Sequence, residues 1–133
     1  MIPPFDENGF LPAGIHPAML DEIDARFGQL SELRRVQMES VKWMADLALR
    51  SGAERIVLNG SFVTDIMEPN DVDCVLLFLP GRRKSRQAFR ELLAGLPFLD
   101  IVVAGPAEFE DFVNEVFSAD RYGIPKGMIE VIQ

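Results

Sequence analysis

Cysteine, histidine and long hydrophobic runs are the scarcest features of this sequence. Its 133 residues include one cysteine, Cys74, and one histidine, His16. A single cysteine excludes an intrachain disulfide, so nothing requires an oxidising compartment. A lone His16 is a poor candidate for metal binding or catalysis, and we expect it to cap the first helix or fill a turn. No apolar run approaches the ~18 residues of a membrane span, and residues 1–7 lack the basic start of a signal peptide, so we predict a cytoplasmic protein.

Basic side chains are also scarce. The chain has 13 Lys and Arg against 21 Asp and Glu, which gives a formal net charge of −8. Nucleic-acid binding through the general surface is disfavoured, because it depends on clustered cations. Any phosphate ligand must therefore be held locally, by metal ions or by a small basic patch. The dense basic cluster from Arg82 to Arg86 is expected to be a solvated loop and first helical turn, and a phosphate or acceptor contact is the alternative.

Hydrophobic residues are plentiful, at 48% of the chain, and ten Phe supply bulk for one modest core. Helical and strand periodicities predict a single domain over 1–133 with an α/β (α+β) fold, in which helices pack mainly on one face of a small mixed sheet. Its parts are an N-terminal arm over 1–15, a helical region over 16–52, a core motif region over 55–104, and a C-terminal helix and strand over 105–133. The expected helices span about 17–27, 31–51, 80–96 and 107–117, and the expected strands span 55–59, 72–79, 99–104 and 128–132.

Residues typical of helix ends indicate where the first two helices begin and end. Pro17 suits the first position of the first helix, Ser31 is a plausible cap of the second, and Gly52 is a plausible stop. On the second helix we expect Trp43 to widen the core face and Arg34 to lie on the solvated face.

The most informative stretch joins Gly60-Ser61 to Asp71-Val72-Asp73 through a polar loop. The apolar run before Gly60 ends in this turn, whose backbone N–H groups and hydroxyl can hold the terminal phosphates of a nucleotide. If the run from Val72 is a strand, Asp71 and Asp73 point to one face, because side chains alternate along a strand. Two like charges held side by side favour a cation between them. The alternatives are a tight turn that needs Gly60 for its backbone angles, and a polar surface turn at Asp71.

Asp73 and Asp100 both lie inside apolar runs, where an unpaired carboxylate is costly or shifts its pKa. If their strands are neighbours, Asp100 can complete a three-carboxylate cluster, accept a proton from an attacking hydroxyl or help to hold a metal. The alternative for Asp100 is a carboxylate at the mouth of a strand that caps a neighbouring turn. Cys74 should face the core, opposite Asp73, and we expect it to be unreactive.

Together, these residues resemble the signature of the nucleotidyltransferase superfamily, which has the DNA polymerase beta-like fold. That signature is Gly-Ser or Gly-Gly, a spacer, Asp-apolar-Asp, and a third carboxylate on a later strand; Gly60, Ser61, Asp71, Asp73 and Asp100 fall on those positions. The match covers about residues 55–104, and the chain's size is similar to that of the minimal nucleotidyltransferases. The wider set of sequence motifs, from Gly14-Ile15-His16 to Pro125-Lys126-Gly127, is similar to an uncharacterised bacterial and phage branch of the superfamily.

The resemblance implies transfer of a nucleoside monophosphate from a nucleoside triphosphate (NTP), such as ATP, to an acceptor hydroxyl. It implies that Asp71, Asp73 and Asp100 are the catalytic and metal-binding residues, with two Mg²⁺ or Mn²⁺ ions. Gly60 and Ser61 would bind the β- and γ-phosphates, and Asp100 would orient or deprotonate the acceptor. Positioning and charge neutralisation would supply most of the rate enhancement.

The chain departs from the minimal members near the turn. No Lys or Arg follows Gly60-Ser61, where Val63, Thr64 and Asp65 stand, and Asn59 replaces the usual apolar residue before the glycine. A second interpretation therefore stays open: a non-catalytic binding protein, such as the antitoxin partner of a helical toxin, or a nucleotide sensor.

The acceptor stays open among a protein side chain, a small molecule such as an antibiotic, and an RNA end, and a protein partner is a further expectation. The partner would be a toxin or a modification target, and an exposed sheet edge would favour a homo-oligomer. Asp120, Arg121 and Lys126 lie in a turn-rich segment that we expect to form a hairpin, and closure over the candidate site is the alternative.

Overall fold

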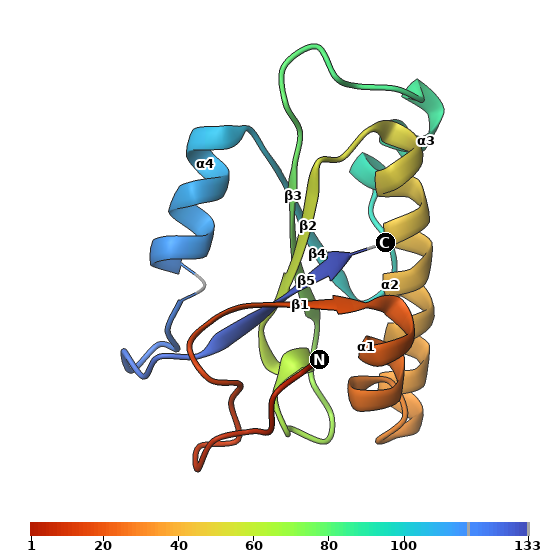
Figure 1. Ribbon diagram of the computed structural model, residues 1–133. Coiled ribbons are helices and arrows are strands. Elements are labelled where there is room, and N and C mark those ends of the chain that lie inside the picture. Colours follow the sequence, from red (N-terminus) through yellow and green to blue (C-terminus); the bar gives the residue numbers. More distant parts are fainter. Residues whose placement is uncertain (117, 133) are drawn as a thin grey trace.

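The computed structural model describes residues 1–116 and 118–132, which form an α+β fold (Figure 1). A 3₁₀ turn covers Ser61–Val63, and a π-helical turn, Phe112–Val116, continues the last helix. The regular elements, in chain order, are β1 (Gly14–Met19), α1 (Leu20–Phe27), α2 (Glu32–Ser51), β2 (Arg55–Asn59), β3 (Val72–Leu77), α3 (Arg86–Ala94), β4 (Leu99–Ala104), α4 (Pro106–Asp111) and β5 (Gly127–Ile132).

The five strands form one sheet in the order β1-β5-β2-β3-β4. Two pairs are parallel, β1 with β5 and β3 with β4, and the central strand β2 is antiparallel to both of its neighbours. The predicted small mixed sheet is therefore confirmed. The parallel pairing of β3 with β4 matters most for function, because it places the starts of both strands at the same end of the sheet.

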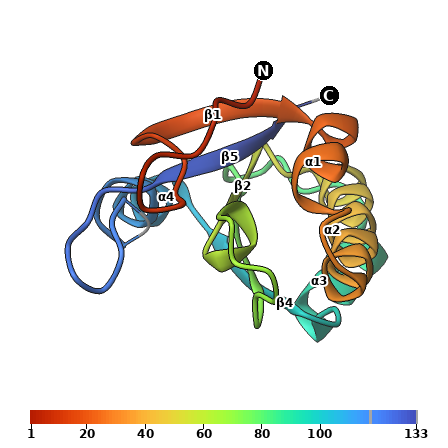
Figure 2. The same ribbon diagram turned by 90° about the horizontal axis from the view of Figure 1, so that it is seen from below.

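Helices α1, α2 and α3 cover one face of the sheet and α4 covers part of the other (Figures 1 and 2). Cys74 and Leu76 of β3 point into the larger core beneath α1–α3, while Val75 and Leu77 point into the smaller core beneath α4. The prediction that helices pack mainly on one face is confirmed. Cys74 is buried in the larger core, as the alternation along β3 predicted. Among residues 1–116 and 118–132, no helix combines the length and the apolar character needed to cross a bilayer.

The prediction that a helix begins at Pro17 is wrong. Residues 14–19 form β1, and α1 begins at Leu20, where the Glu22 carboxylate accepts the Met19 N–H at 3.2 Å. Pro17 is tolerated because β1 lies at the edge of the sheet, where a missing N–H costs little. His16 therefore lies in a strand and caps no helix; its Nε2 lies 2.7 Å from the Pro12 carbonyl oxygen.

The predicted faces of α2 also need correction. Arg34, expected in solvent, is 0% exposed, and Trp43, expected in the core, is 50% exposed. The buried face of α2 includes two polar residues near its start, Arg34 and Gln37. The core-facing side of the helix expected from its apolar residues alone was therefore displaced around the helix axis. The caps are as predicted, since Ser31 Oγ accepts the Arg34 N–H and Gly52 ends the helix with a left-handed backbone.

Two other helices are shorter than expected. Residues 80–85 form a loop, and α3 begins at Arg86 after the cap Ser85, whose Oγ accepts the Ala88 N–H at 3.1 Å. The α-helical part of α4 ends at Asp111 before the π-helical turn. Residue 117, the expected end of that helix, lies outside the described residues.

Candidate functional site

Asp73 and Asp100 lie side by side at one end of the sheet. The β3–β4 register pairs Asp73 with Asp100, just as it pairs Val75 with Val102 two residues further along. Adjacent strands are ~4.8 Å apart, and residues in register on parallel strands point to the same face. Both carboxylates therefore project from the α4 face of the sheet; Asp73 is half-buried and Asp100 is exposed. The structure thus brings together two acids that lie far apart in the chain.

The surroundings of Asp73 destabilise its ionised form more than the nearby cation Lys126 stabilises it. Burial, and then the neighbouring Asp100 charge, raise the pKa of Asp73; Lys126 opposes this shift and Asp71 adds to it. A raised pKa means that the ionised carboxylate is destabilised relative to water, by an amount that a bound cation would recover. Asp73 is thus a carboxylate that a bound cation would stabilise.

Gly60 makes the close approach behind this carboxylate possible. Its φ of 84° and ψ of −166° lie in a region that only glycine adopts readily. A Cβ at this position would collide with the Asp73 carboxylate. The glycine of the Gly-Ser turn is therefore needed for both its backbone angles and the space it leaves. Gly60 is thus required by the tight turn itself, and it also lies against the carboxylate of the candidate site.

Asn59 adds an unpartnered oxygen to the same place. The β2–β3 register pairs it with Asp73, so its side chain projects from the same face. Asn59 is 2% exposed, and its Oδ1 has no hydrogen-bond partner among the described residues. Buried polar atoms are seldom left unpaired, and exceptions call for an explanation such as an ion or a ligand. The oxygens of Asn59, Asp73 and Asp100 are hard donors of the kind that Mg²⁺ prefers.

A buried arginine holds the segment that follows the Gly-Ser turn. The Arg34 guanidinium donates hydrogen bonds to the carbonyl oxygens of Phe62 at 2.7 Å and Thr64 at 2.9 Å, and to that of Ser61 at 3.3 Å. It also donates to the carbonyl of Ile66. Burial lowers the pKa of Arg34 and the Asp65 charge opposes that shift. The guanidinium carries several N–H donors in one plane, and these bind successive backbone carbonyls. Arg34, which belongs to α2, therefore holds the backbone of residues 61–66 in place.

The other predicted site residues lie close to this pair. Asp71 is exposed one residue before β3, and its charge acts on Asp73. Ser61 begins the 3₁₀ turn directly after Gly60. Across residues 1–116 and 118–132, no three His, Cys, Asp or Glu side chains are grouped closely enough to hold a metal ion as they stand. Mg²⁺ commonly takes one or two carboxylates and completes its shell with water and substrate phosphates, so the donors present fit that ion.

Asp65, the extra acid after the turn, is directed at the N-terminal arm. Its carboxylate packs against Gly9, and its backbone N–H donates to the Gly9 carbonyl at 3.0 Å. Its charge acts on Arg34. Asp65 therefore interacts with the N-terminal arm and with the buried arginine.

Lys126 was expected to belong to a hairpin, but its charge also acts on Asp73. Residues 119–125 form the expected hairpin-like turn, closed by a bridge between Ala119 and Pro125. Lys126 follows this turn, and its positive charge acts on Asp73. No local motif marks this lysine, because its place near the carboxylates depends on how β5 inserts into the sheet. Asn59 had a visible signal: a polar residue at the end of an apolar strand.

The fold and the site define a small α+β protein with a carboxylate pair at one end of a mixed sheet. The chain belongs to the DUF6932 family, a family of unknown function, whose model matches residues 3–132. Comparison with curated proteins and with solved structures found no match.

Proposed function

We propose that this protein is a metal-dependent nucleotidyltransferase that transfers a nucleoside monophosphate from an NTP to an acceptor hydroxyl. One observation carries the proposal: Asp73 and Asp100 are in register on parallel strands, beside Gly60 and the unpartnered Oδ1 of Asn59. A half-buried acid with a raised pKa, beside a second acid and an orphaned oxygen, is a costly arrangement in a protein without a cationic ligand. A metal-bound triphosphate would relieve that cost.

The proposed roles follow from the positions of the side chains. Asp73 and Asp100, with Asp71 beside them, hold the metal ions, which when bound neutralise phosphate charge and favour in-line displacement. The turn at Gly60 and Ser61 binds the terminal phosphates through its backbone N–H groups and the hydroxyl. Lys126 supplies the positive charge that the segment after the turn lacks.

The reaction itself is a substitution at the α-phosphorus. The acceptor oxygen forms a bond to that phosphorus, the bond to the bridging oxygen breaks, and pyrophosphate leaves with the bonding electrons. Asp100, the more exposed acid of the pair, takes the hydroxyl proton.

Isothermal titration with Mg²⁺ and each NTP tests the proposal. We compare the wild type with Asp73→Asn/Asp100→Asn and with a matched control, Glu108→Gln/Asp111→Asn, which removes two exposed acids from α4. The proposal predicts that at least one NTP binds in a Mg²⁺-dependent manner to the wild type and the control, and that this Mg²⁺-dependent component of binding is lost in the carboxylate variant. Equal Mg²⁺-dependent binding by all three proteins, or none by the wild type, would contradict it. Transfer of label from the α-phosphate to a candidate acceptor then separates an enzyme from a sensor.

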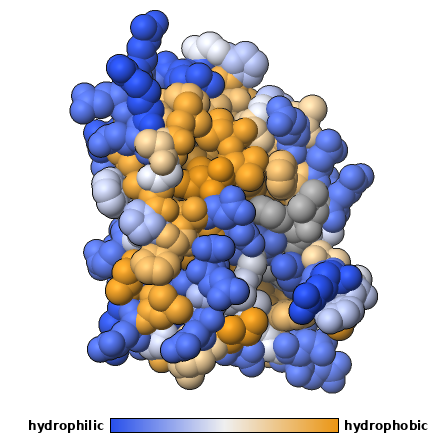
Figure 3. Space-filling view, turned by 180° about the vertical axis from the view of Figure 1, so that it is seen from behind, coloured by the Kyte–Doolittle hydropathy of each residue, from blue (hydrophilic) through white to orange (hydrophobic). Residues whose placement is uncertain are grey.

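A second candidate function is partner binding without catalysis, as in an antitoxin that pairs with a helical toxin. The observation that favours it is the edge strand β4, the last in the sheet order. Hydrophobic side chains gather on the face that Figure 3 shows, and Leu99, Ile101 and Val103 of β4 are only partly buried. Unpaired strand edges of this kind are sites where another chain can add. Retained partner binding by the carboxylate variant would favour this function.

A further inference from the structure

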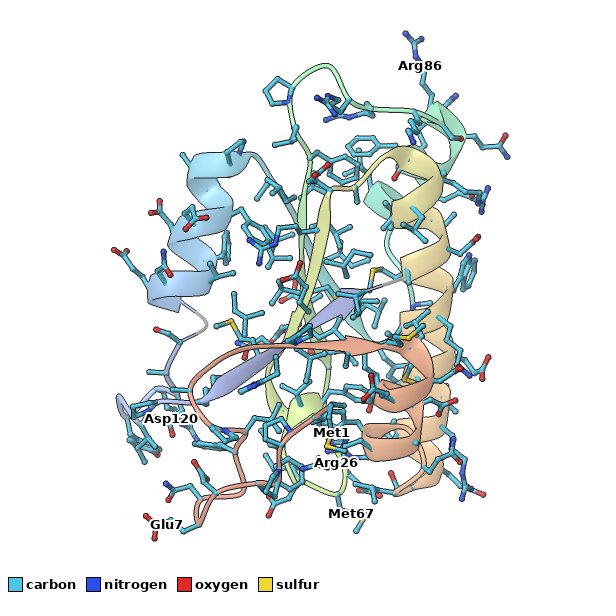
Figure 4. The ribbon with its side chains drawn as sticks, in the orientation of Figure 1. Met1, Glu7, Arg26, Met67, Arg86 and Asp120 are labelled. Atoms are coloured by element: carbon cyan, nitrogen blue, oxygen red, sulfur yellow. The ribbon has the colours of Figure 1, made fainter. Side chains whose placement is uncertain are left out.

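A basic cavity lies at the far end of β3 from the carboxylates. It has a volume of about 620 Å³, within the range of small-molecule sites. Figure 4 shows Arg86 at the end of the molecule opposite Glu7 and Met67. Because β3 rises ~3.3 Å per residue, the five residues from Asp73 to Phe78 separate the two regions by about 17 Å. The lining residues are Arg83, Lys84, Arg86, Phe89 and Arg90.

The cavity lies within a segment of the chain that is rich in cations. Residues 82–90 contain five of the 13 Lys and Arg of the chain and no Asp or Glu. The ion pairs among residues 1–116 and 118–132 involve none of these five cations. Five exposed cations that form no ion pair with an acid of the described residues create a local positive field.

The backbone that carries these cations is held in place. The N–H of Lys84 donates to the Ser51 carbonyl at 2.9 Å, and that of Ser85 donates to the Arg50 carbonyl at 3.0 Å. The Arg83 guanidinium lies 3.9 Å from the centre of the Phe89 ring. Stacking on an aromatic ring orients a guanidinium while leaving its N–H donors free. The cavity therefore presents partly preorganised donors.

We propose that this cavity binds a small anion with adjoining phosphate groups, at a site separate from the carboxylate pair. Arginine forks match phosphate oxygens in paired hydrogen bonds, and several cations around one cavity match a chain of phosphates better than a single charge. The anion is small because a nucleic acid would continue past the cavity, and outside residues 82–90 the chain carries 21 Asp and Glu against eight Lys and Arg. The site requires no metal and does not depend on the proposed transfer reaction.

Calorimetric titration with inorganic tripolyphosphate, in the presence of a chelator, tests this site. The variant Arg86→Gln/Arg90→Gln removes two lining cations but keeps the stack of Arg83 on Phe89. The control Arg35→Gln/Arg121→Gln removes the same charge from exposed positions elsewhere. We expect one tripolyphosphate per chain, with affinity about tenfold or more weaker in the cavity variant and changed by less than about twofold in the control. Thermal unfolding of each variant verifies that it is folded.

Additional ligands and one further variant decide the outcome. ATP should compete with tripolyphosphate, which shows that the phosphate chain is recognised, and Asp73→Asn/Asp100→Asn should bind tripolyphosphate as the wild type does. Equal weakening in both arginine variants, or no binding at physiological ionic strength, would overturn the proposal. So would tighter binding of a short single-stranded RNA than of tripolyphosphate, since it would indicate a nucleic-acid surface. Loss of binding in the carboxylate variant would place the ligand at the other site and would also overturn it.

Discussion

Asp73 and Asp100 occupy the same register position on the parallel strands β3 and β4, so two acids 27 residues apart in the chain share one face of the sheet. Burial and this neighbour raise the pKa of Asp73 above its ordinary value of 3.8. The protein thus keeps a half-buried carboxylate in a place that disfavours its charge. Strain of this kind is typical of positions selected for binding rather than for stability.

The raised pKa of Asp73 should make the free energy of unfolding depend on pH. Because its pKa is raised on folding, the folded protein holds more protons than the unfolded chain between pH 3.8 and the raised value. Its contribution to stability is therefore full below pH 3.8 and is lost as the pH rises through the folded pKa.

We predict that Asp73→Asn is more stable than the wild type at pH 7, and that the difference shrinks as the pH falls towards 3.8. Urea unfolding over a series of pH values measures it, with exposed Asp111→Asn as the control. A variant that is less stable than the wild type at neutral pH would contradict the account.

The glycine of the Gly-Ser turn should be irreplaceable for two separable reasons. Gly60→Ala incurs backbone strain of about 1–3 kcal/mol and, in addition, a collision with the Asp73 carboxylate that we expect to cost ~1–3 kcal/mol more. Gly95→Ala is the matched control, because Gly95 has a similar backbone (φ 91°, ψ 156°) and a Cβ added there would meet nothing within 4 Å. Chemical denaturation of both variants isolates the cost of the collision.

A double-mutant cycle identifies the collision partner. If the excess cost of Gly60→Ala arises at the Asp73 carboxylate, then Asp73→Ala should remove most of it. Additive effects in the double variant would show that the two residues do not interact.

Arg34 should be among the residues most sensitive to substitution. Arg34→Met leaves the carbonyls of Ser61, Phe62 and Thr64 without their donor, and we expect a loss of about 3–5 kcal/mol in the free energy of unfolding. Arg35→Met, one residue along the same helix but exposed, should change it by less than about 0.5 kcal/mol. Similar losses in the two variants would refute the role of Arg34 as the anchor of residues 61–66.

Cys74 provides a built-in probe of unfolding. Burial, followed by the charges of Asp73 and Asp100, raises the pKa of its thiol, and the side chain is 0% exposed. We predict that a thiol reagent modifies the native protein at least about 10³-fold more slowly than the urea-unfolded chain, because only the open state reacts. Rapid modification of the native protein would show that β3 opens locally or that Cys74 lies elsewhere.

The sequence carried enough local information to place most elements. Ser31 and Gly52 bracket α2, and the alternation along β3 placed Cys74 in the core and Asp73 opposite it. These features depend on residues that are close in the chain, so rules for helix capping and hydrophobic periodicity can predict them.

Other features depend on contacts between distant segments. Strand β1 carries a proline and pairs with β5, more than 100 residues away, so its own sequence favours a helix start. Arg34 looked like a surface cation because its partners, the carbonyls after Gly60, come from another element. The approach of Lys126 to Asp73 likewise follows from strand order, which short-range patterns do not encode.

The most direct test of the carboxylate site is to locate a bound divalent ion in solution. In an NMR titration of ¹⁵N-labelled protein with Mn²⁺, paramagnetic broadening should first affect the amides of Asn59, Gly60, Asp73 and Asp100, and Asp73→Asn should abolish this pattern. Broadening that begins elsewhere on the acidic surface, or a pattern that persists in Asp73→Asn, would contradict the proposal that this end of the sheet binds a metal ion and a nucleotide.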